Sequence, residues 1–329
     1  MTTTSPQWFM RRKSALLDRD CYELRDAALP DLADGQVATR TMFISLDPYL
    51  AKSMQTWEGP DPRWSSGEIM GRTVFEITES RDSRYKPGDV AWGVGRWRGN
   101  DVFDADALKA VPKGANPPSL ALGALGASGL TAWIGLDLGG LKPGQTLFVS
   151  AATGPVGSMA GQLAKMRGCR VIGQAGGPEK CAYAVDTLGF DACIDHRTPD
   201  NAGQLAAAAP EGVDLVFENI GQPSLDPALA NMKFGGVIML CGLAAHYNSD
   251  QPMVLRNYRE FLYRRLTFQG FITAEHEHLY PQALEEMSAG IASGQIKVEE
   301  TLIDGLENAA DAYLAMLRGE GFGKRLIRL

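Results

Sequence analysis

The pattern of apolar and polar residues changes near residue 120. Before it, short alternating stretches are separated by clusters of Gly, Pro and Asp. This pattern predicts short strands, at 9–10, 36–45 and 72–78, and a turn at 85–88 that leads into another strand. Residues 120–139 are rich in Ala, Gly and Leu and predict closely packed helices at a domain junction. The first third of the chain is therefore expected to be a β-rich domain.

After residue 145, apolar runs alternate with helical patterns. The runs predict strands at 146–149, 169–175, 192–194, 214–218, 236–241 and 266–272. Strand and helix in alternation predict a doubly wound parallel sheet, an α/β fold. From about residue 275 we expect a long amphipathic helix, a strand near Val298, a helix at 306–317 and a last strand at 324–329. This tail is expected to pack on the first domain, with a ligand in the cleft between the domains.

The segment 146–165 carries the strongest chemical signal. It begins with an apolar strand, passes through Ala152-x-Gly154-x-x-Gly157, and continues into a helix with Met159, Leu163 and Met166 at helical spacing. The free N–H groups of a helix N-terminus attract a phosphate, and glycines let the backbone approach it. The spacing is a variant of the dinucleotide fingerprint, and a second strand at 169–175 completes the βαβ unit. A plain structural turn is the alternative.

The end of the second strand distinguishes the two nicotinamide cofactors. NAD sites usually place an acid there for the ribose hydroxyls. This chain has Gln174-Ala175-Gly176-Gly177, followed by Lys180 and later by His196-Arg197. The absence of an acid at the strand end and the presence of nearby cations favour a 2′-phosphate, and hence NADP(H). Glu179 supports the alternative, since it could be the acid in a displaced position.

Composition sets the protein class. The 329 residues are 45% hydrophobic and 22% charged, which is typical of a globular chain. A net charge of −7 argues against nucleic-acid and anionic-membrane partners. Neither a membrane-spanning run nor an N-terminal signal region is evident, so we expect the cytoplasm. The five cysteines form no Cys-x-x-Cys pair and the four histidines are scattered, so we expect no metal site.

The whole chain resembles the zinc-independent medium-chain dehydrogenases/reductases, and within them the NADPH-dependent leukotriene/prostaglandin, alkenal double-bond and curcumin reductases. The motifs that carry this resemblance are Asp47-Pro48-Tyr49-Leu50, Gly126-x-x-Gly129-Leu130-Thr131-Ala132-Trp133, 150–157, 161–165, Glu179-Lys180, Glu218-Asn219-Ile220-Gly221, Cys241-Gly242, Tyr247-Asn248, Gln269-Gly270-Phe271 and Gly323-Lys324. The family fold implies a GroES-like substrate domain at 1–124, a Rossmann NADPH-binding domain at 125–275, and a tail at 276–329 that returns to the first domain.

The resemblance also implies roles for single residues. Lys180 matches the residue that contacts the 2′-phosphate, and His196 stands where the family usually has a tyrosine facing the same phosphate. A cofactor-contacting asparagine of the family is replaced by Gly321. The full set of implied cofactor contacts is Thr153, Gly154, Pro155, Val156, Gly157, Lys180, His196, Asn219, Cys241, Gly242, Tyr247, Phe271 and Ile272.

The implied reaction is reduction of the carbon–carbon double bond of an α,β-unsaturated ketone or aldehyde. Tyr247 matches the family's tyrosine donor to the enolate oxygen, and Tyr49 is the second candidate catalytic residue. The expected substrate is small and apolar, in a pocket lined by these tyrosines and by Met54, Trp57, Trp92 and Tyr258. The alternatives are an NADPH quinone oxidoreductase and a non-catalytic NADPH-binding redox sensor. Family members also imply a homodimer, through the strand at 266–272.

Overall fold

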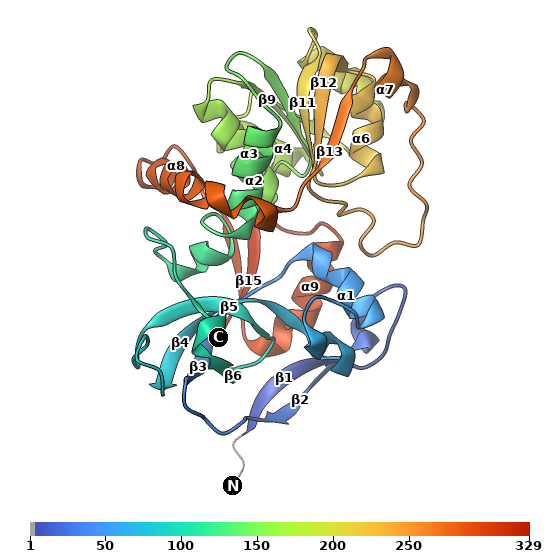
Figure 1. Ribbon diagram of the computed structural model, residues 1–329. Helices are drawn as coiled ribbons and strands as arrows, with labels where there is room; N and C mark the ends of the chain where they lie inside the picture. The colour runs from blue at the N-terminus through green and yellow to red at the C-terminus, as the bar shows by residue number, and fades with distance from the viewer. Residues whose placement is uncertain (1–3) are drawn as a thin grey trace. The chain divides into compact units, whose positions relative to one another are not determined.

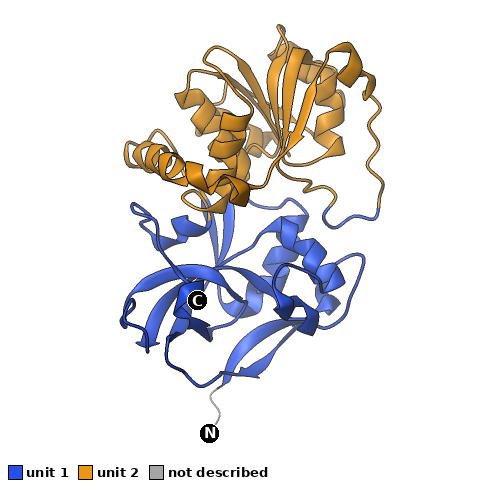
Figure 2. Cartoon of the chain, in the orientation of Figure 1, with its two compact units in different colours: residues 1–122, 247–250, 300–329 blue, residues 123–246, 251–299 orange. Residues whose placement is uncertain are grey.

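A computed structural model describes residues 4–329, which form two compact units (Figures 1 and 2). Unit 1 holds the described residues up to Leu122, together with Tyr247–Asp250 and Glu300–Leu329. Unit 2 holds Gly123–His246 and Gln251–Glu299. Among residues 4–329, no helix has the length and apolar character needed to cross a bilayer.

Unit 2 is built on a parallel sheet of six strands, in the order β10-β9-β8-β11-β12-β13. Counted from the first strand, this is the order 3-2-1-4-5-6 of a doubly wound sheet, which confirms the predicted fold class. The strands are β8 Thr146–Val149, β9 Arg170–Ala175, β10 Ala192–Asp195, β11 Val213–Glu218, β12 Met232–Leu240 and β13 Thr267–Gly270.

Helices connect these strands and bury their apolar faces against the sheet. They are α2 Ala127–Leu138, α3 Pro155–Met166, α4 Pro178–Asp186, α5 Asn201–Ala208, α6 Gln222–Leu229, α7 Arg259–Tyr263, η6 Thr273–Leu279 and α8 Tyr280–Ala292. Phe148, Ile172 and Val216 lie in one buried cluster, to which neighbouring strands each contribute. The continuous apolar runs in the sequence thus become strands covered on both faces.

Unit 1 contains an antiparallel sheet, with one parallel pair at its end, in the order β14-β15-β3-β4-β5-β7; β6 pairs with β3, and β1 and β2 form a separate hairpin. Its elements are β1 Thr4–Met10, η1 Arg19–Cys21, β2 Tyr22–Ala28, β3 Gln36–Ser45, η2 Pro48–Leu50, α1 Ala51–Thr56, η3 Pro62–Ser66, β4 Met70–Ser80, β5 Val90–Arg96, β6 Asn100–Asp104, η4 Ala105–Ala107, β7 Lys109–Ala110, η5 Pro118–Leu122, β14 Glu300–Asp304, η7 Leu306–Asn308, α9 Ala309–Leu317 and β15 Lys324–Arg328. The predicted β-rich domain is present, and β3 has the predicted bounds.

The tail differs from the expectation in where it returns. Residues 276–299 belong to unit 2, because α8 packs on α2: Met287 lies against Gly129, and Glu286 accepts a hydrogen bond from Trp133. The chain rejoins unit 1 only at Glu300, where β14 pairs with β15. That unit 1 binds the substrate and unit 2 binds the cofactor stays a prediction.

Candidate functional site

The turn between β8 and α3 has the form of a phosphate-binding turn. Gly154 precedes the helix, and having no side chain it leaves the first-turn N–H groups uncovered. A Cβ at Gly157 would lie 2.3 Å from the backbone oxygen of Ala151, so only glycine lets the helix start this close to the strand end. Thr153 is buried, while Pro155 and Val156 are half-buried at the start of α3. An anion at this position would meet backbone donors and the positive end of α3.

A second turn, between β9 and α4, carries the basic residues. A Cβ at Gly176 would lie 2.8 Å from Nε2 of His196 and 3.1 Å from Nε of Arg197, so both side chains lie directly against this turn. Lys180 is in the first helical turn that follows Gly177. Asp195 faces the backbone: its Oδ1 accepts from the N–H groups of Gly177 (2.8 Å) and Arg197 (3.0 Å). The Asp195 carboxylate is thus occupied by backbone donors of this turn.

A buried hydrogen-bond network holds the ends of β8, β11 and β12 together. Oε1 of Glu218 accepts from the Ser150 and Ser224 hydroxyls (2.8 and 2.6 Å) and from the N–H groups of Ile220 and Gly221 (2.6 and 2.8 Å). Burial raises the pKa of Glu218 although these donors oppose the shift. Its Oε2 is buried without a hydrogen-bond partner among the described residues.

Asn219 and Cys241 belong to the same network. The Asn219 amide donates to the Ser150 oxygen (2.7 Å), and the Cys241 thiol donates to Asn219 Oδ1 (2.8 Å). A Cβ at Gly242 would lie 2.9 Å from the backbone oxygen of Asn219, which explains the glycine. Asn219 thus links the ends of neighbouring strands through its side-chain hydrogen bonds. Its contact with the cofactor stays a prediction.

The candidate catalytic tyrosine Tyr49 lies in a charged network of unit 1. Arg72 Nη1 donates to the Tyr49 hydroxyl oxygen (2.7 Å), and Arg72 is 3.9 Å from Asp47 Oδ2. Asp47 is paired with the buried Lys324 at 2.6 Å. Burial alone would raise the pKa of Asp47, but Lys324 and Arg72 hold it below its ordinary value. Desolvation and the Asp47 charge raise the pKa of Tyr49 to about 12, so its hydroxyl is protonated at neutral pH.

Tyr247 lies on a short loop that is attached to unit 1. Asn248 accepts from the Leu17 N–H (2.7 Å) and donates to the Leu17 oxygen (3.2 Å), while Gln55 donates to the Tyr247 backbone oxygen (3.0 Å). The charge of Tyr247 is among the groups that raise the pKa of Tyr49. Tyr247 also packs against the apolar cluster that contains Leu50 and Met54, so its loop lies beside the segment that carries Tyr49, although 198 positions separate the two tyrosines.

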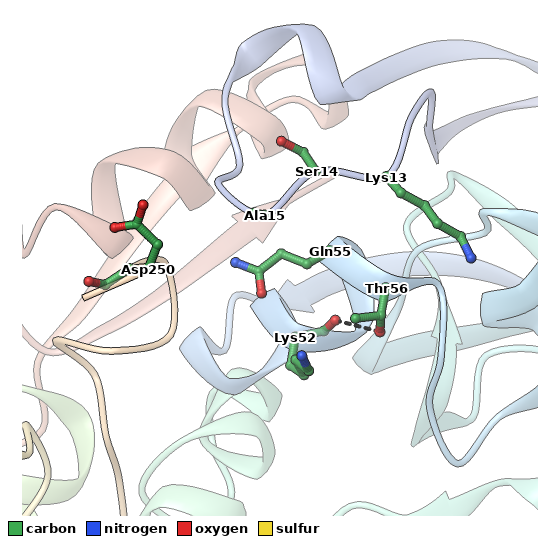
Figure 3. A pocket seen from close by; sticks show the side chains of 8 residues that line it. Lys13, Ser14, Ala15, Lys52, Gln55, Thr56 and Asp250 are labelled. Carbon is green, nitrogen blue, oxygen red and sulfur yellow. Dashed lines mark hydrogen bonds between the residues drawn. The ribbon is translucent and has the colours of Figure 1, made fainter. Parts of the chain in front are cut away.

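A pocket of about 530 Å³ lies beside this loop in unit 1 (Figure 3). It is lined by residues of three segments: Lys13, Ser14, Ala15, Lys52, Gln55, Thr56, Ser249 and Asp250. Met54, predicted to face the substrate, is 0% exposed and packs under Tyr22, so that prediction is wrong.

The residues of unit 2 fit NADP(H). The Gly154–Gly157 turn would take the pyrophosphate, and the bare Gly176–Gly177 turn, with its basic neighbours, would take the 2′-phosphate. Phe271 packs on Gly135 behind the end of β13, and Ile272 beyond it is exposed. Within residues 4–329, no cluster of His, Cys, Asp and Glu side chains is arranged to hold a metal ion. Zinc independence stays a prediction.

The structure brings the predicted residues together in two groups. One is at the carboxyl ends of the unit 2 strands, and the other is the Tyr49–Tyr247 pair. Sequence reasoning missed Arg72, whose role depends on strand β4 lying beside Tyr49, and the clamp formed by Gln55 and Asn248. No local pattern marks these contacts, because each residue acts through a partner distant in sequence.

Comparison with known proteins identifies the family. The profile described as "Zinc-binding dehydrogenase" matches residues 155–289, and that described as "N-terminal domain of oxidoreductase" matches residues 7–111. NADPH-dependent curcumin reductase of Escherichia coli is 39% identical over 315 residues, which cover 92% of this chain and 90% of the relative. Prostaglandin reductase 1 of Rattus norvegicus is 34% identical, with 93% of both chains covered.

Further relatives and a solved structure agree with this. The NADP(+)-dependent 2-alkenal reductase of Nicotiana tabacum is 33% identical, covering 88% of this chain and 86% of the relative. The crystal structure of CurA from Vibrio vulnificus in complex with NADPH superposes with a TM-score of 0.89 at 35% identity, covering 98% of each chain. The predictions of an oxidoreductase and of NADP(H) as cofactor are confirmed at the level of the family. The chain belongs to the medium-chain dehydrogenase/reductase superfamily, in a family of NADPH-dependent oxidoreductases.

Proposed function

We propose that this enzyme reduces the carbon–carbon double bond of α,β-unsaturated ketones or aldehydes. NADPH, when bound, supplies the hydride, which adds to the β-carbon of the substrate. Negative charge then develops on the carbonyl oxygen as an enolate, and donors aimed at that oxygen stabilise it. The observation that carries the proposal is that Tyr49 and Tyr247 lie in the same part of unit 1, where Tyr247 packs on the cluster that contains Leu50.

Arg72 determines what the Tyr49 hydroxyl can do. Because the guanidinium donates to the hydroxyl oxygen, the hydroxyl proton remains for another acceptor. With a pKa of about 12, Tyr49 keeps that proton at neutral pH and acts as a hydrogen-bond donor. The Arg72 charge also favours an oxyanion close to Tyr49. Tyr247 is proposed as the principal donor and source of the proton, on a loop that Asn248 and Gln55 hold in position.

Selection of NADPH over NADH is proposed to rest on Lys180, His196 and Arg197. The last two side chains lie against Gly176, and Lys180 is in the first turn of the adjacent helix α4. An exposed cation near a 2′-phosphate contributes a charge-assisted hydrogen bond worth about 1.5–3 kcal/mol. NADH lacks the phosphate and gains nothing from these groups, so its binding should be weaker.

The decisive experiment measures NADPH oxidation with a 2-alkenal, an arylbutenone and a quinone, with NADH run in parallel. Turnover of an enone to the saturated carbonyl, identified by mass spectrometry, would support the proposal. Turnover of the quinone alone would favour the quinone oxidoreductase. Tight NADPH binding without turnover of any acceptor would favour the non-catalytic sensor. Equal rates with NADH would contradict the role of Lys180.

We also propose a homodimer formed through unit 2. β13 is the outer strand of its sheet and is exposed along its whole length. Large apolar side chains surround it, among them Leu262 at 76% exposure, Ile272 at 63% and Phe234 at 60%. An exposed strand edge next to such a patch favours pairing with another chain. A second copy of this chain can pair with the β13 edge and cover the apolar patch. A two-fold axis places the β13 edge of one copy beside the β13 edge of the other.

Light scattering tests the dimer. The wild-type chain should give twice the monomer mass of 35.5 kDa, and Leu262→Glu should shift the distribution toward monomer. Val94→Glu is the matched control, since Val94 is an exposed apolar residue (47%) of unit 1. A wild-type protein that is monomeric at micromolar concentration would refute this part of the proposal.

A further inference from the structure

His246 directly precedes the candidate catalytic Tyr247, and its side chain contacts the start of helix α6. Its Nε2 atom accepts a hydrogen bond from the backbone N–H of Gln222, the first residue of α6, at 3.2 Å. A Cβ at Gly221 would lie 2.6 Å from Cδ2 and 2.8 Å from Nε2 of His246, so the imidazole sits directly on the turn between β11 and α6. The imidazole therefore binds a donor that the helix itself leaves unsatisfied.

The segment that leads to Tyr247 is also held on this turn by its backbone. The N–H groups of Ala244 and Ala245 each donate at 3.0 Å to a carbonyl oxygen of the turn. Together with the imidazole, three hydrogen bonds join residues 244–246 to residues 219–222, and we call this set the clasp. Of the three, the bond to the imidazole depends on a kind of side chain that changes charge between about pH 5 and 8.

Beyond Tyr247 the chain is held by other partners. Gln55 donates to the Tyr247 backbone oxygen (3.0 Å), and Asn248 exchanges two hydrogen bonds with the backbone of Leu17. Tyr247 thus has an anchor on each side in the sequence, with the clasp before it and these contacts after it. A hydroxyl that must meet a developing oxyanion needs a fixed position, since a misplacement of about 1 Å can cost about 100-fold in rate.

We propose that His246 is a positioning residue for Tyr247 and that it acts only as the neutral imidazole, so that acid opens the clasp and slows the reduction. This inference rests on the proposed function, in which Tyr247 donates to the enolate oxygen. Nε2 accepts a hydrogen bond only when it carries a lone pair, which places the proton of the neutral ring on Nδ1. Protonation puts an N–H on Nε2, facing the N–H of Gln222 and the positive end of α6, and the hydrogen bond is lost. His246 is half-buried, so solvent protons reach it.

Other titratable groups lie near the clasp and are rival sources of a pH effect. On the segments that form or adjoin it, residues 218–229 and 241–250, they are Glu218, Asp226, Cys241, Tyr247 and Asp250. Glu218 is bound to the same turn, because its Oε1 accepts from the Gly221 N–H at 2.8 Å, and burial raises its pKa. A variant of His246 that cannot titrate keeps Glu218 in place and separates the two groups.

The test measures kcat of the full chain between about pH 5.5 and 8, with saturating NADPH and with a 2-alkenal or an arylbutenone. In the wild type, kcat should fall about five- to tenfold toward the acid end, which corresponds to one neutral hydrogen bond, while the KM of the enone changes less than about twofold. Because the reduction consumes a proton, acid by itself gives no reason for such a fall.

Three variants show whether the effect comes from His246 and acts through Tyr247. His246→Gln offers an acceptor that does not titrate, so its kcat should stay within about twofold of one value across this pH range. His246→Phe offers no acceptor and should show the low kcat of the acid form at every pH. Tyr247→Phe lacks the hydroxyl that His246 positions, so its residual kcat should not fall in acid.

His278→Gln is the matched control, because His278 is an exposed histidine of the same unit, and it should keep the wild-type pH profile. Far-UV circular dichroism at each pH verifies that every variant is folded. A wild-type kcat that does not change with pH, or an acid fall that persists in His246→Gln, would overturn the inference while leaving enone reduction intact. Absence of enone turnover by the wild type at any pH would contradict the proposed function, and the inference with it.

Discussion

Replacement of Lys324 by methionine should strongly destabilise unit 1. Lys324 Nζ lies 2.6 Å from Asp47 Oδ1 and 3.1 Å from the Leu46 oxygen. The two charged side chains are only 3% and 10% exposed. Methionine keeps the apolar stem but leaves the Asp47 carboxylate buried beside a more distant Arg72. Breaking a buried pair in this way costs about 3–5 kcal/mol.

The sign of the pH dependence follows from the Asp47 pKa. In the wild type, this pKa is depressed, so the pair stabilises the fold above the unfolded pKa near 3.9, and the contribution is lost only as pH falls below it. Without Lys324, burial dominates and raises the Asp47 pKa. The variant then takes up a proton at higher pH than the wild type does. The stability difference should therefore be largest at pH 7 and shrink toward pH 4.

Urea unfolding followed by tryptophan fluorescence measures this difference, since five of the six tryptophans are in unit 1. The control is Lys86→Met, at an exposed position of the same unit, which should stay within about 0.5 kcal/mol of the wild type. The double variant Lys324→Met/Asp47→Asn removes both charges and should recover more than half of the loss. A single variant within 1 kcal/mol of wild type, or a double variant as unstable as the single, would refute the reasoning.

Four further predictions concern catalysis and cofactor choice. Tyr247→Phe should lower kcat about 100-fold with little change in KM, because the donor acts mainly on the developing oxyanion; unchanged steady-state kinetics would exclude it. Arg72→Lys keeps the charge but loses the guanidinium fork, so kcat should fall about tenfold; wild-type activity would show that the contact with Tyr49 does not matter. Because the pKa of Tyr49 is about 12, its ionisation should leave kcat unchanged up to about pH 10. A fall in kcat that begins near pH 8 would show that another group supplies the proton. Lys180→Ala should raise the NADPH KM about tenfold and leave the NADH KM unchanged, whereas an equal change in both would place Lys180 outside the 2′-phosphate site.

Much of the fold followed from local patterns. The apolar runs at 146–149 and 214–218 predict strands because a strand buried on both faces needs no polar alternation. The small residues around Gly154 and Gly157 predict a tight strand-to-helix turn, since the backbone there leaves no space for a side chain. The hairpin strand β2 was missed, because most of its side chains are exposed and polar and give no apolar pattern. The tail boundary was misplaced since α8 has an apolar face that fits either unit by sequence alone.

The sequence by itself determined the strand and helix alternation, the two glycine turns and the absence of an acid at the end of β9. These are local properties, set by spacing and by the size of neighbouring side chains. Only the tertiary structure decided which distant groups meet: Lys324 with Asp47, 277 positions apart, and Arg72 with Tyr49. Such contacts depend on strand order, since β15 and β4 both pair with β3. The stability that these contacts contribute depends on the burial and the charges around each pair. Those surroundings come from several distant segments, so no single stretch of sequence contains them.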